Sequence, residues 1–106
     1  MKTNDGPEIQ AIPTIYKGIE FRSRLEADAA SFMDRLGWAW EYETKSFLLR
    51  NGIHYRPDFF IESENLFVEC RGYSSDKGDA QLAGFVGLIQ RDDKLSHANF
   101  LILSPL

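Results

Sequence analysis

The sequence predicts an α/β fold in which a mixed central β-sheet is flanked by helices. Three features of its 106 residues indicate this class. Residues 23–36 carry apolar side chains at helical spacing, and residues 80–91 do so again further along the chain. Between these helices, residues 55–72 contain two strand-like stretches around a polar turn. Because the short apolar stretch 99–103 follows the second helix, we expect a final strand that runs parallel to residues 66–71.

The first helix is expected at residues 23–36, and capping residues mark both of its ends. Ser23 and Glu26 form the S-x-x-E pattern of a capping box, and Gly37 is the residue type that commonly follows a helix. Glu26 has a second interpretation, in which its carboxylate points toward the sheet from the first helical turn. The apolar stripe that should face the sheet consists of Leu25, Ala29, Phe32, Met33 and Leu36.

Residues 38–43 alternate between aromatic and other side chains, as expected of a half-buried strand. We expect the aromatic row in the core, and stacking on unpaired bases is the alternative. Glu41 and Glu43 lie on the other face of this strand and are expected in solvent. The aromatic row consists of Trp38, Trp40 and Tyr42.

A hairpin is predicted next, with strands at residues 46–49 and 53–55. Asn51 and Gly52 between them form the strongest turn signal of the chain, because both residue types tolerate positive φ angles. His54 is the lone histidine of these strands, and we expect a structural or surface role for it.

Two strands at the centre of the chain are expected to bring two acidic residues together. Pro57 precedes a strand at 58–61, and a second strand follows at 66–71 after four polar residues that suit a tight loop. With a loop of that length, Asp58 lies opposite Glu69. Alternate side chains share a face, so one face should carry Phe59, Ile61, Leu66, Val68 and Cys70, and the other Asp58, Phe60, Phe67, Glu69 and Arg71.

Opposed carboxylates on an aromatic face need a compensating charge. At about 5 Å and an effective dielectric constant of about 20, two negative charges repel by about 3 kcal/mol. Compensation can come from a proton, from Arg71 two residues beyond Glu69, or from a divalent cation between the carboxylates. Oxygen ligands on a rigid sheet suit Mg²⁺ or Mn²⁺.

The combination of Pro57-Asp58 with Glu69-Cys70-Arg71 resembles the motif of the PD-(D/E)XK nuclease superfamily. Residues 21–27 also resemble the first helix of these nucleases, which contributes a further acidic residue. The resemblance covers residues 16–103. It implies a restriction-endonuclease-like core with the order α-β-β-β-α-β and a magnesium-dependent endonuclease that hydrolyses DNA phosphodiester bonds.

The resemblance also implies roles for individual residues. Asp58 and Glu69 would bind Mg²⁺ or Mn²⁺, the backbone carbonyl of Cys70 would add a ligand, and Glu26 would complete the acidic set directly or through water. The family usually has Lys where this chain has Arg71. Because Arg keeps its proton, Arg71 would hold developing negative charge and would not activate water. The implied catalytic set is Glu26, Asp58, Glu69 and Arg71.

Four further residues are candidates for phosphate binding. Arg22 and Arg24 lie near the start of the first helix, where they could position a phosphate group. Lys77 lies in a polar segment, residues 73–79, that is expected to be a loop, and Gln81 lies at the start of the second helix. For Lys77 a solvated loop position is the alternative.

The second helix contains two residues that disfavour helix formation. Gly84 and Gly87 each cost about 1 kcal/mol relative to Ala, unless they mark close packing of the helix on the sheet. The apolar side of this helix consists of Leu82, Phe85, Val86 and Ile89.

A different class of function is also open, a catalytically inactive nuclease-like module that binds nucleic acid or a protein partner, as a nuclease subunit or inhibitor. In that case Arg71 would neutralise Asp58 and Glu69 by an ion pair. The formal net charge of −4 argues against binding nucleic acid by bulk charge alone. A homodimer or a larger nuclease assembly is open in either case.

Length and composition predict one domain at residues 14–106 after an N-terminal arm at 1–13. The hydrophobic content of 43% is typical of a globular chain and not of a disordered one. Cys70 is the single cysteine, so no internal disulfide forms. We see no apolar run that would cross a membrane and no secretion signal, and therefore expect a cytoplasmic protein without membrane partners.

Overall fold

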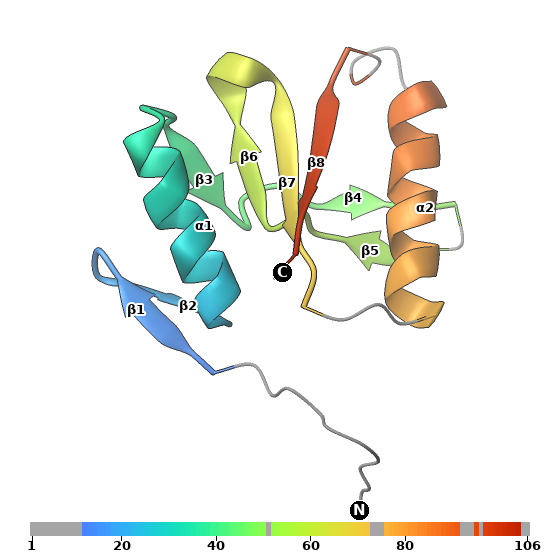
Figure 1. Cartoon of the computed structure of the whole chain (residues 1–106). Helices are drawn as coiled ribbons and strands as arrows, with labels where there is room; N and C mark the ends of the chain where they lie inside the picture. Colours follow the sequence, from blue (N-terminus) through green and yellow to red (C-terminus); the bar gives the residue numbers. More distant parts are fainter. Residues whose placement is uncertain (1–11, 51, 73–75, 92–94, 96, 105–106) are drawn as a thin grey trace, which may run out of the picture.

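The computed structural model describes residues 12–50, 52–72, 76–91, 95 and 97–104, with the side chains of 76–79 excepted. Most of the expected N-terminal arm, residues 1–11, lies outside this part. Figure 1 shows helices against a central sheet, with small hairpins beside it. The elements are β1 (Thr14–Tyr16), β2 (Ile19–Phe21), α1 (Arg24–Arg35), β3 (Trp40–Tyr42), β4 (Phe47–Leu48), β5 (His54–Tyr55), β6 (Phe59–Ile61), the 3₁₀ turn η1 (Glu62–Glu64), β7 (Leu66–Cys70), α2 (Asp76–Arg91) and β8 (Asn99–Leu103).

The central sheet is mixed and has the strand order β3-β6-β7-β8. β6 pairs antiparallel with both β3 and β7, whereas β8 runs parallel to β7 after the α2 connection. The α1 and α2 helices lie on opposite sides of this sheet in Figure 1. The predicted α/β class with a mixed sheet flanked by helices is therefore confirmed, and the elements of the central unit follow one another as α1, β3, β6, β7, α2 and β8.

The pairing of β6 with β7 has the predicted register, and the side chains alternate between two cores as expected. Phe59, Ile61 and Val68 pack with α1 residues in one core. Phe67 packs with Phe85 of α2 in the other core. The paired residues are Phe59 with Val68, Phe60 with Phe67, and Ile61 with Leu66.

Helix α1 begins and ends where the capping residues predict. The Ser23 hydroxyl accepts a hydrogen bond from the Glu26 N–H at 3.1 Å, so Ser23 is the N-cap. At the other end, Gly37 takes a φ of 78°, and the Trp38 N–H donates to the Met33 carbonyl at 3.0 Å. These features form a Schellman motif, in which a residue with positive φ satisfies the last helical carbonyls.

The predicted apolar stripe of α1 is wrong at two of its five positions. Phe32 and Leu36 are both 47% exposed, while Met33 is buried as expected. The alanines of α1 let this helix approach the sheet closely. The larger Phe32 and Leu36 lie on the exposed side of the helix. The buried side of the helix consists of Glu26, Ala27, Ala29, Ala30 and Met33.

A hairpin that the sequence analysis did not predict precedes α1. β1 and β2 pair antiparallel around Lys17 and Gly18, whose φ angles of 53° and 77° suit a tight two-residue turn. The hairpin is fixed to the helix because the Tyr16 hydroxyl donates to Asp34 at 2.5 Å. Asp34 also accepts from Trp40 Nε1 at 2.9 Å, and so it ties hairpin, helix and β3 together.

The predicted hairpin at 46–55 is present with shorter strands. β4 pairs antiparallel with β5, and the Leu49 N–H donates to the Ile53 carbonyl at 2.8 Å. Gly52 has a φ of 84°, which a side chain would disfavour, so this glycine sets the turn. His54 is exposed at the edge of a cavity described below.

Helix α2 begins at Asp76, four residues before the predicted start, so residues 76–79 are not a loop. Phe85 and Ile89 are buried as expected. A Cβ atom at Gly84 would lie 3.2 Å from the Leu49 side chain, so this glycine permits close packing of α2 on the β4–β5 hairpin.

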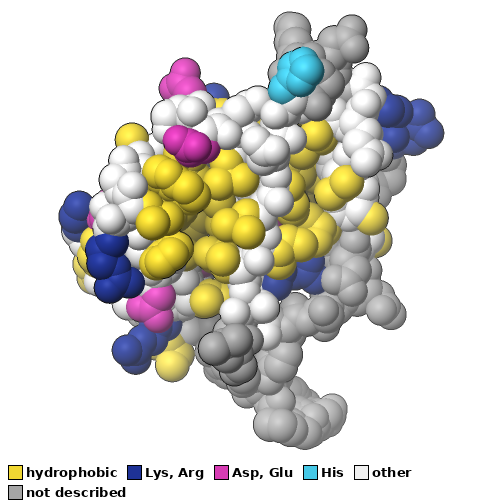
Figure 2. All heavy atoms as spheres, turned by 45° about the horizontal axis from the view of Figure 1, so that its top comes forward, with side chains coloured by type: hydrophobic (Ala, Val, Ile, Leu, Met, Phe, Trp, Pro, Cys, Tyr) yellow, Lys and Arg dark blue, Asp and Glu magenta, His cyan; other side chains and the backbone are white. Residues whose placement is uncertain are grey.

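Apolar side chains also remain on the surface, and Figure 2 shows them gathered on one face. β8 is the last strand of the sheet, and its Leu101 and Ile102 are 38% and 48% exposed. A homodimer or larger assembly stays a prediction. Among the described residues, neither helix has the length and apolar character needed to cross a membrane.

Candidate active site

An open cavity lies where β6 begins and β7 ends. Its volume is about 520 Å³. Because these strands are antiparallel, the start of β6 and the end of β7 lie at the same end of the sheet. The β4–β5 hairpin and α2 line the other side of the cavity. The residues that line the cavity are Arg22, Glu43, Ser46, His54, Tyr55, Arg56, Asp58, Glu69 and Gln81.

Asp58 forms part of the cavity floor and is only 3% exposed. Its Oδ2 accepts a hydrogen bond from the Cys70 N–H at 2.7 Å, and its Oδ1 accepts one from Arg22 Nη2 at 3.0 Å. Burial, together with the neighbouring Glu69 carboxylate, raises the pKa of Asp58 to about 7. The two hydrogen bonds hold the carboxyl group in place. They lower its pKa by less than burial and the Glu69 charge raise it.

Glu69 lies beside Asp58 on the cavity floor, as the predicted strand register requires. Burial raises the pKa of Glu69, against the opposing influence of Tyr55, the Asp58 backbone and Arg71. The Tyr55 hydroxyl is close to this carboxylate, yet neither it nor Glu69 Oε1 makes a hydrogen bond of ordinary geometry within the described part of the chain. A buried carboxylate oxygen without a partner costs free energy, so this edge of the floor is suited to receive a donor or a cation.

Glu26 takes part in the N-terminal cap of α1 through its backbone, and its carboxylate is directed at Arg22 and Tyr42. Its backbone N–H belongs to the helix cap, and its Oε1 accepts hydrogen bonds from the Tyr42 hydroxyl at 2.7 Å and from the Arg22 N–H at 3.0 Å. Its Oε2 lies 3.5 Å from Arg22 Nη2, the nitrogen that also contacts Asp58. Glu26 is therefore buried within reach of the acidic floor, although it does not line the cavity.

Two further residues join this group that the sequence analysis assigned elsewhere. Glu43 was expected in solvent, but its Oε2 lies 2.5 Å from Arg22 Nη2. The reason is a φ of 56° at Glu43, which ends the strand alternation and turns the side chain toward the site. Tyr42 packs against Phe21 and Phe59 in the expected core position, and its hydroxyl still reaches Glu26.

Cys70 is the last residue of β7 and Arg71 follows it, but neither residue lines the cavity. Arg71 is half-buried after β7, with its N–H donating to the Leu103 carbonyl at 2.8 Å, and its charge acts on both Glu69 and Tyr55. The Cys70 thiol packs against the α1 core. Burial and the charge of Asp58 raise the pKa of Cys70, so the thiol stays neutral and is no candidate nucleophile.

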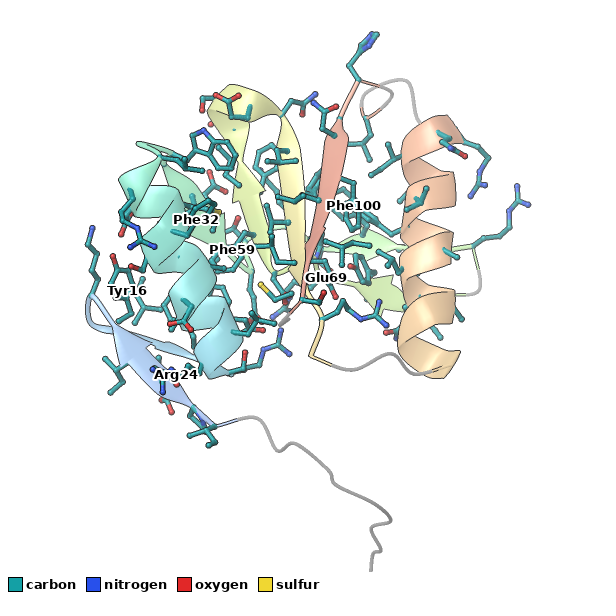
Figure 3. The ribbon with its side chains drawn as sticks, viewed as in Figure 1. Tyr16, Arg24, Phe32, Phe59, Glu69 and Phe100 are labelled. Atoms are coloured by element: carbon teal, nitrogen blue, oxygen red, sulfur yellow. The ribbon has the colours of Figure 1, made fainter. Side chains whose placement is uncertain are left out.

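The candidates for phosphate binding have different positions. Arg22 and Gln81 line the cavity, but Arg24 does not. The Arg24 side chain is 83% exposed, and its Nε lies 3.9 Å from Asp28 Oδ2. Figure 3 shows Arg24 well apart from Glu69. The Lys77 side chain lies outside the described residues. Arg56, which the sequence analysis did not select, lines the cavity instead.

The donor set fits a hard divalent cation in its chemistry. Asp58 and Glu69 offer carboxylate oxygens at the floor of an open cavity, and burial and like charge raise the pKa of Asp58. Among the described residues, Glu69 Oε1 has no hydrogen-bond partner. Arg22 already places a cation between Glu26, Glu43 and Asp58. Within the residues that the structure describes, no group of three or more His, Cys, Asp or Glu side chains is arranged to hold a metal ion.

Comparison with known proteins gives no relative from which a function could be transferred. No protein-family model, no curated protein and no solved structure matches this chain.

Proposed function

We propose that this chain is a metal-dependent endonuclease that hydrolyses DNA phosphodiester bonds. The observation that carries the proposal is the pair formed by the buried Asp58 and the half-buried Glu69 on the floor of an open cavity whose lining also includes Arg22 and Arg56. Paired acidic groups beside cations suit a reaction in which a metal ion and a phosphate must be bound together.

Residues that line the cavity or lie next to it can be assigned either to metal binding or to phosphate binding. Asp58 and Glu69 would hold Mg²⁺ or Mn²⁺, with the Cys70 carbonyl as a further ligand and Glu26 acting directly or through water. When bound, the ion lowers the pKa of a water molecule and polarises the phosphate. Arg71 would act as a fixed cation for the charge that develops on phosphate, because its guanidinium cannot serve as a base. Arg22, Arg56 and Gln81 would contact the phosphate backbone.

The order of the central elements supports this assignment. Helix α1, strands β3, β6 and β7, helix α2 and strand β8 follow one another as α-β-β-β-α-β. This is the order expected from the resemblance to the PD-(D/E)XK superfamily. We propose a restriction-endonuclease-like core on this basis.

One observation favours the alternative of an inactive module that binds nucleic acid or a protein partner. Arg22 Nη2 contacts three carboxylates and partly neutralises the acidic group without any metal ion. In an inactive module, this arginine and Arg71 would be permanent ion-pair partners.

Cleavage of DNA separates the two functions. We expect the wild-type protein to nick supercoiled plasmid DNA in the presence of Mg²⁺ or Mn²⁺, and we expect EDTA to abolish this cleavage. Asp58→Asn should reduce the rate by at least about 100-fold, because even residues that only support a metal ligand typically contribute about 10- to 100-fold. Asp28→Asn is the matched control, since Asp28 is exposed and contacts only Arg24 among the ion pairs of the described residues. Equal rates for wild type and Asp58→Asn would show that the activity belongs to a contaminant or to another site.

A further inference from the structure

The Arg22 guanidinium lies at the point where the carboxylates of three different elements meet. Its Nη2 is 3.0 Å from Asp58 Oδ1, 3.5 Å from Glu26 Oε2 and 2.5 Å from Glu43 Oε2. A single nitrogen with two hydrogens can donate two hydrogen bonds, so one of the three contacts is a charge contact alone. Arg22 is therefore the cation that these three carboxylates share in the metal-free protein.

One arginine does not balance the charge of this group. Glu26, Glu43 and Asp58 together carry three carboxylates, and Glu69 adds a fourth on the same cavity floor. Arg56 Nη1 adds a second positive charge 4.0 Å from Glu43 Oε1. A divalent cation would compensate this excess of negative charge better than one guanidinium does.

The Arg22 side chain can leave this position while its backbone stays anchored. It is 64% exposed, and it precedes the N-cap Ser23, so its movement breaks no helical hydrogen bond. The Arg22 N–H donates to Glu26 Oε1 at 3.0 Å, and the preceding Phe21 is fully buried. Since Arg22 also lines the cavity, the released guanidinium would remain beside any bound phosphate.

We propose that Arg22 is an internal cation that the acidic group exchanges for a divalent metal ion. In the metal-free protein, Arg22 holds Glu26, Glu43 and Asp58 together. When a divalent ion binds, Arg22 gives up these contacts and pairs with a phosphate group of the substrate. This inference rests on the proposed function, and it adds that metal binding and phosphate binding are coupled through one side chain.

The exchange predicts effects of opposite sign for one substitution. In Arg22→Gln the competing cation is gone, so the Kd for Mn²⁺ at pH 8 should fall by at least about 5-fold, a shift in the range of ordinary coupling between two ligands. Binding of a 12-base-pair DNA duplex in Ca²⁺ should weaken by at least about 5-fold, because a charge-assisted phosphate contact is lost. Arg24→Gln should change neither value, and Arg22→Lys should remain close to the wild type for Mn²⁺.

Calorimetry with Mn²⁺ alone, and fluorescence anisotropy with the labelled duplex, measure the two affinities. An equal Kd for Mn²⁺ in wild type and Arg22→Gln would overturn the exchange while leaving the proposed metal site in place. Absence of Mn²⁺ binding in both proteins would overturn the proposed function and the exchange together. If Arg22→Gln does not fold, ¹⁵N spectra of the arginine side chains of the wild-type protein test the exchange. Mg²⁺ should release the restrained Arg22 guanidinium and change its signal. An unchanged Arg22 signal at saturating Mg²⁺ would overturn the exchange.

Discussion

Replacing Glu69 with Gln should make the protein more stable and inactive at the same time. At pH 8 we expect the free energy of unfolding to rise by about 1 kcal/mol, because the substitution removes a half-buried charge that repels Asp58 and whose Oε1 has no hydrogen-bond partner among the described residues. The shape of the side chain is kept, whereas a proposed metal ligand is lost. Metal-dependent cleavage of DNA should therefore fall by at least about 100-fold.

Urea unfolding at pH 8 in EDTA and plasmid nicking in Mg²⁺ measure the two effects of Glu69→Gln. The matched control is Glu64→Gln, because Glu64 is exposed in the turn between β6 and β7 and should change neither stability nor rate. A loss of stability in Glu69→Gln would mean that the electrostatic attraction between Glu69 and Arg71 outweighs the cost of burying Glu69. Retained cleavage would show that Glu69 is not a metal ligand.

The stability of the metal-free protein should fall as the pH rises from about 4 to about 7. Asp58 has an ordinary pKa of 3.8 and a pKa of about 7 in the folded protein. Between these values the folded state holds a proton that the unfolded state has released, so raising the pH favours unfolding. The raised pKa of Glu69 adds to the same trend. Above about pH 7 Asp58 is ionised in both the folded and the unfolded state, so its contribution to the free energy of unfolding should no longer change with pH.

Urea unfolding in EDTA at several pH values between 4 and 8 tests this slope. Asp58→Asn should make the profile flatter, since its side chain does not titrate. Asp34 acts in the opposite direction at lower pH: hydrogen bonds from Tyr16, Lys17 and Trp40 lower its pKa to about 2, and stability should be lost as the pH falls below about 4. A wild-type free energy of unfolding that rises from pH 5 to pH 8 would contradict the described environment of Asp58.

Several features of the fold follow from local rules and were predictable from the sequence. The period of two along a strand and a four-residue loop determine the register of β6 with β7, and so they bring Asp58 and Glu69 to one cavity. Ser23 and Gly37 fix the ends of α1 because each satisfies backbone groups that the helix itself leaves open. These constraints act over a few residues, which is why they can be read without tertiary information.

Other features depend on tertiary contacts and were not predictable in the same way. Glu43 enters the site through a positive φ that no residue type at this position signals. Phe32 is exposed because alanines, and not the largest apolar side chains, form the contact of α1 with the sheet. The β1–β2 hairpin had a signal, since Lys17-Gly18 suits a tight turn, but its strands are only three residues long.

The proposed function requires that Asp58 and Glu69 together bind a divalent cation. Calorimetric titration of the wild-type protein with Mn²⁺ at pH 8 tests it most directly, with Asp58→Asn and the control Asp28→Asn measured in parallel. We expect saturable binding at one site in the wild type and in Asp28→Asn, and loss of this binding in Asp58→Asn. No saturable heat in the wild type, or equal binding by Asp58→Asn, would contradict it.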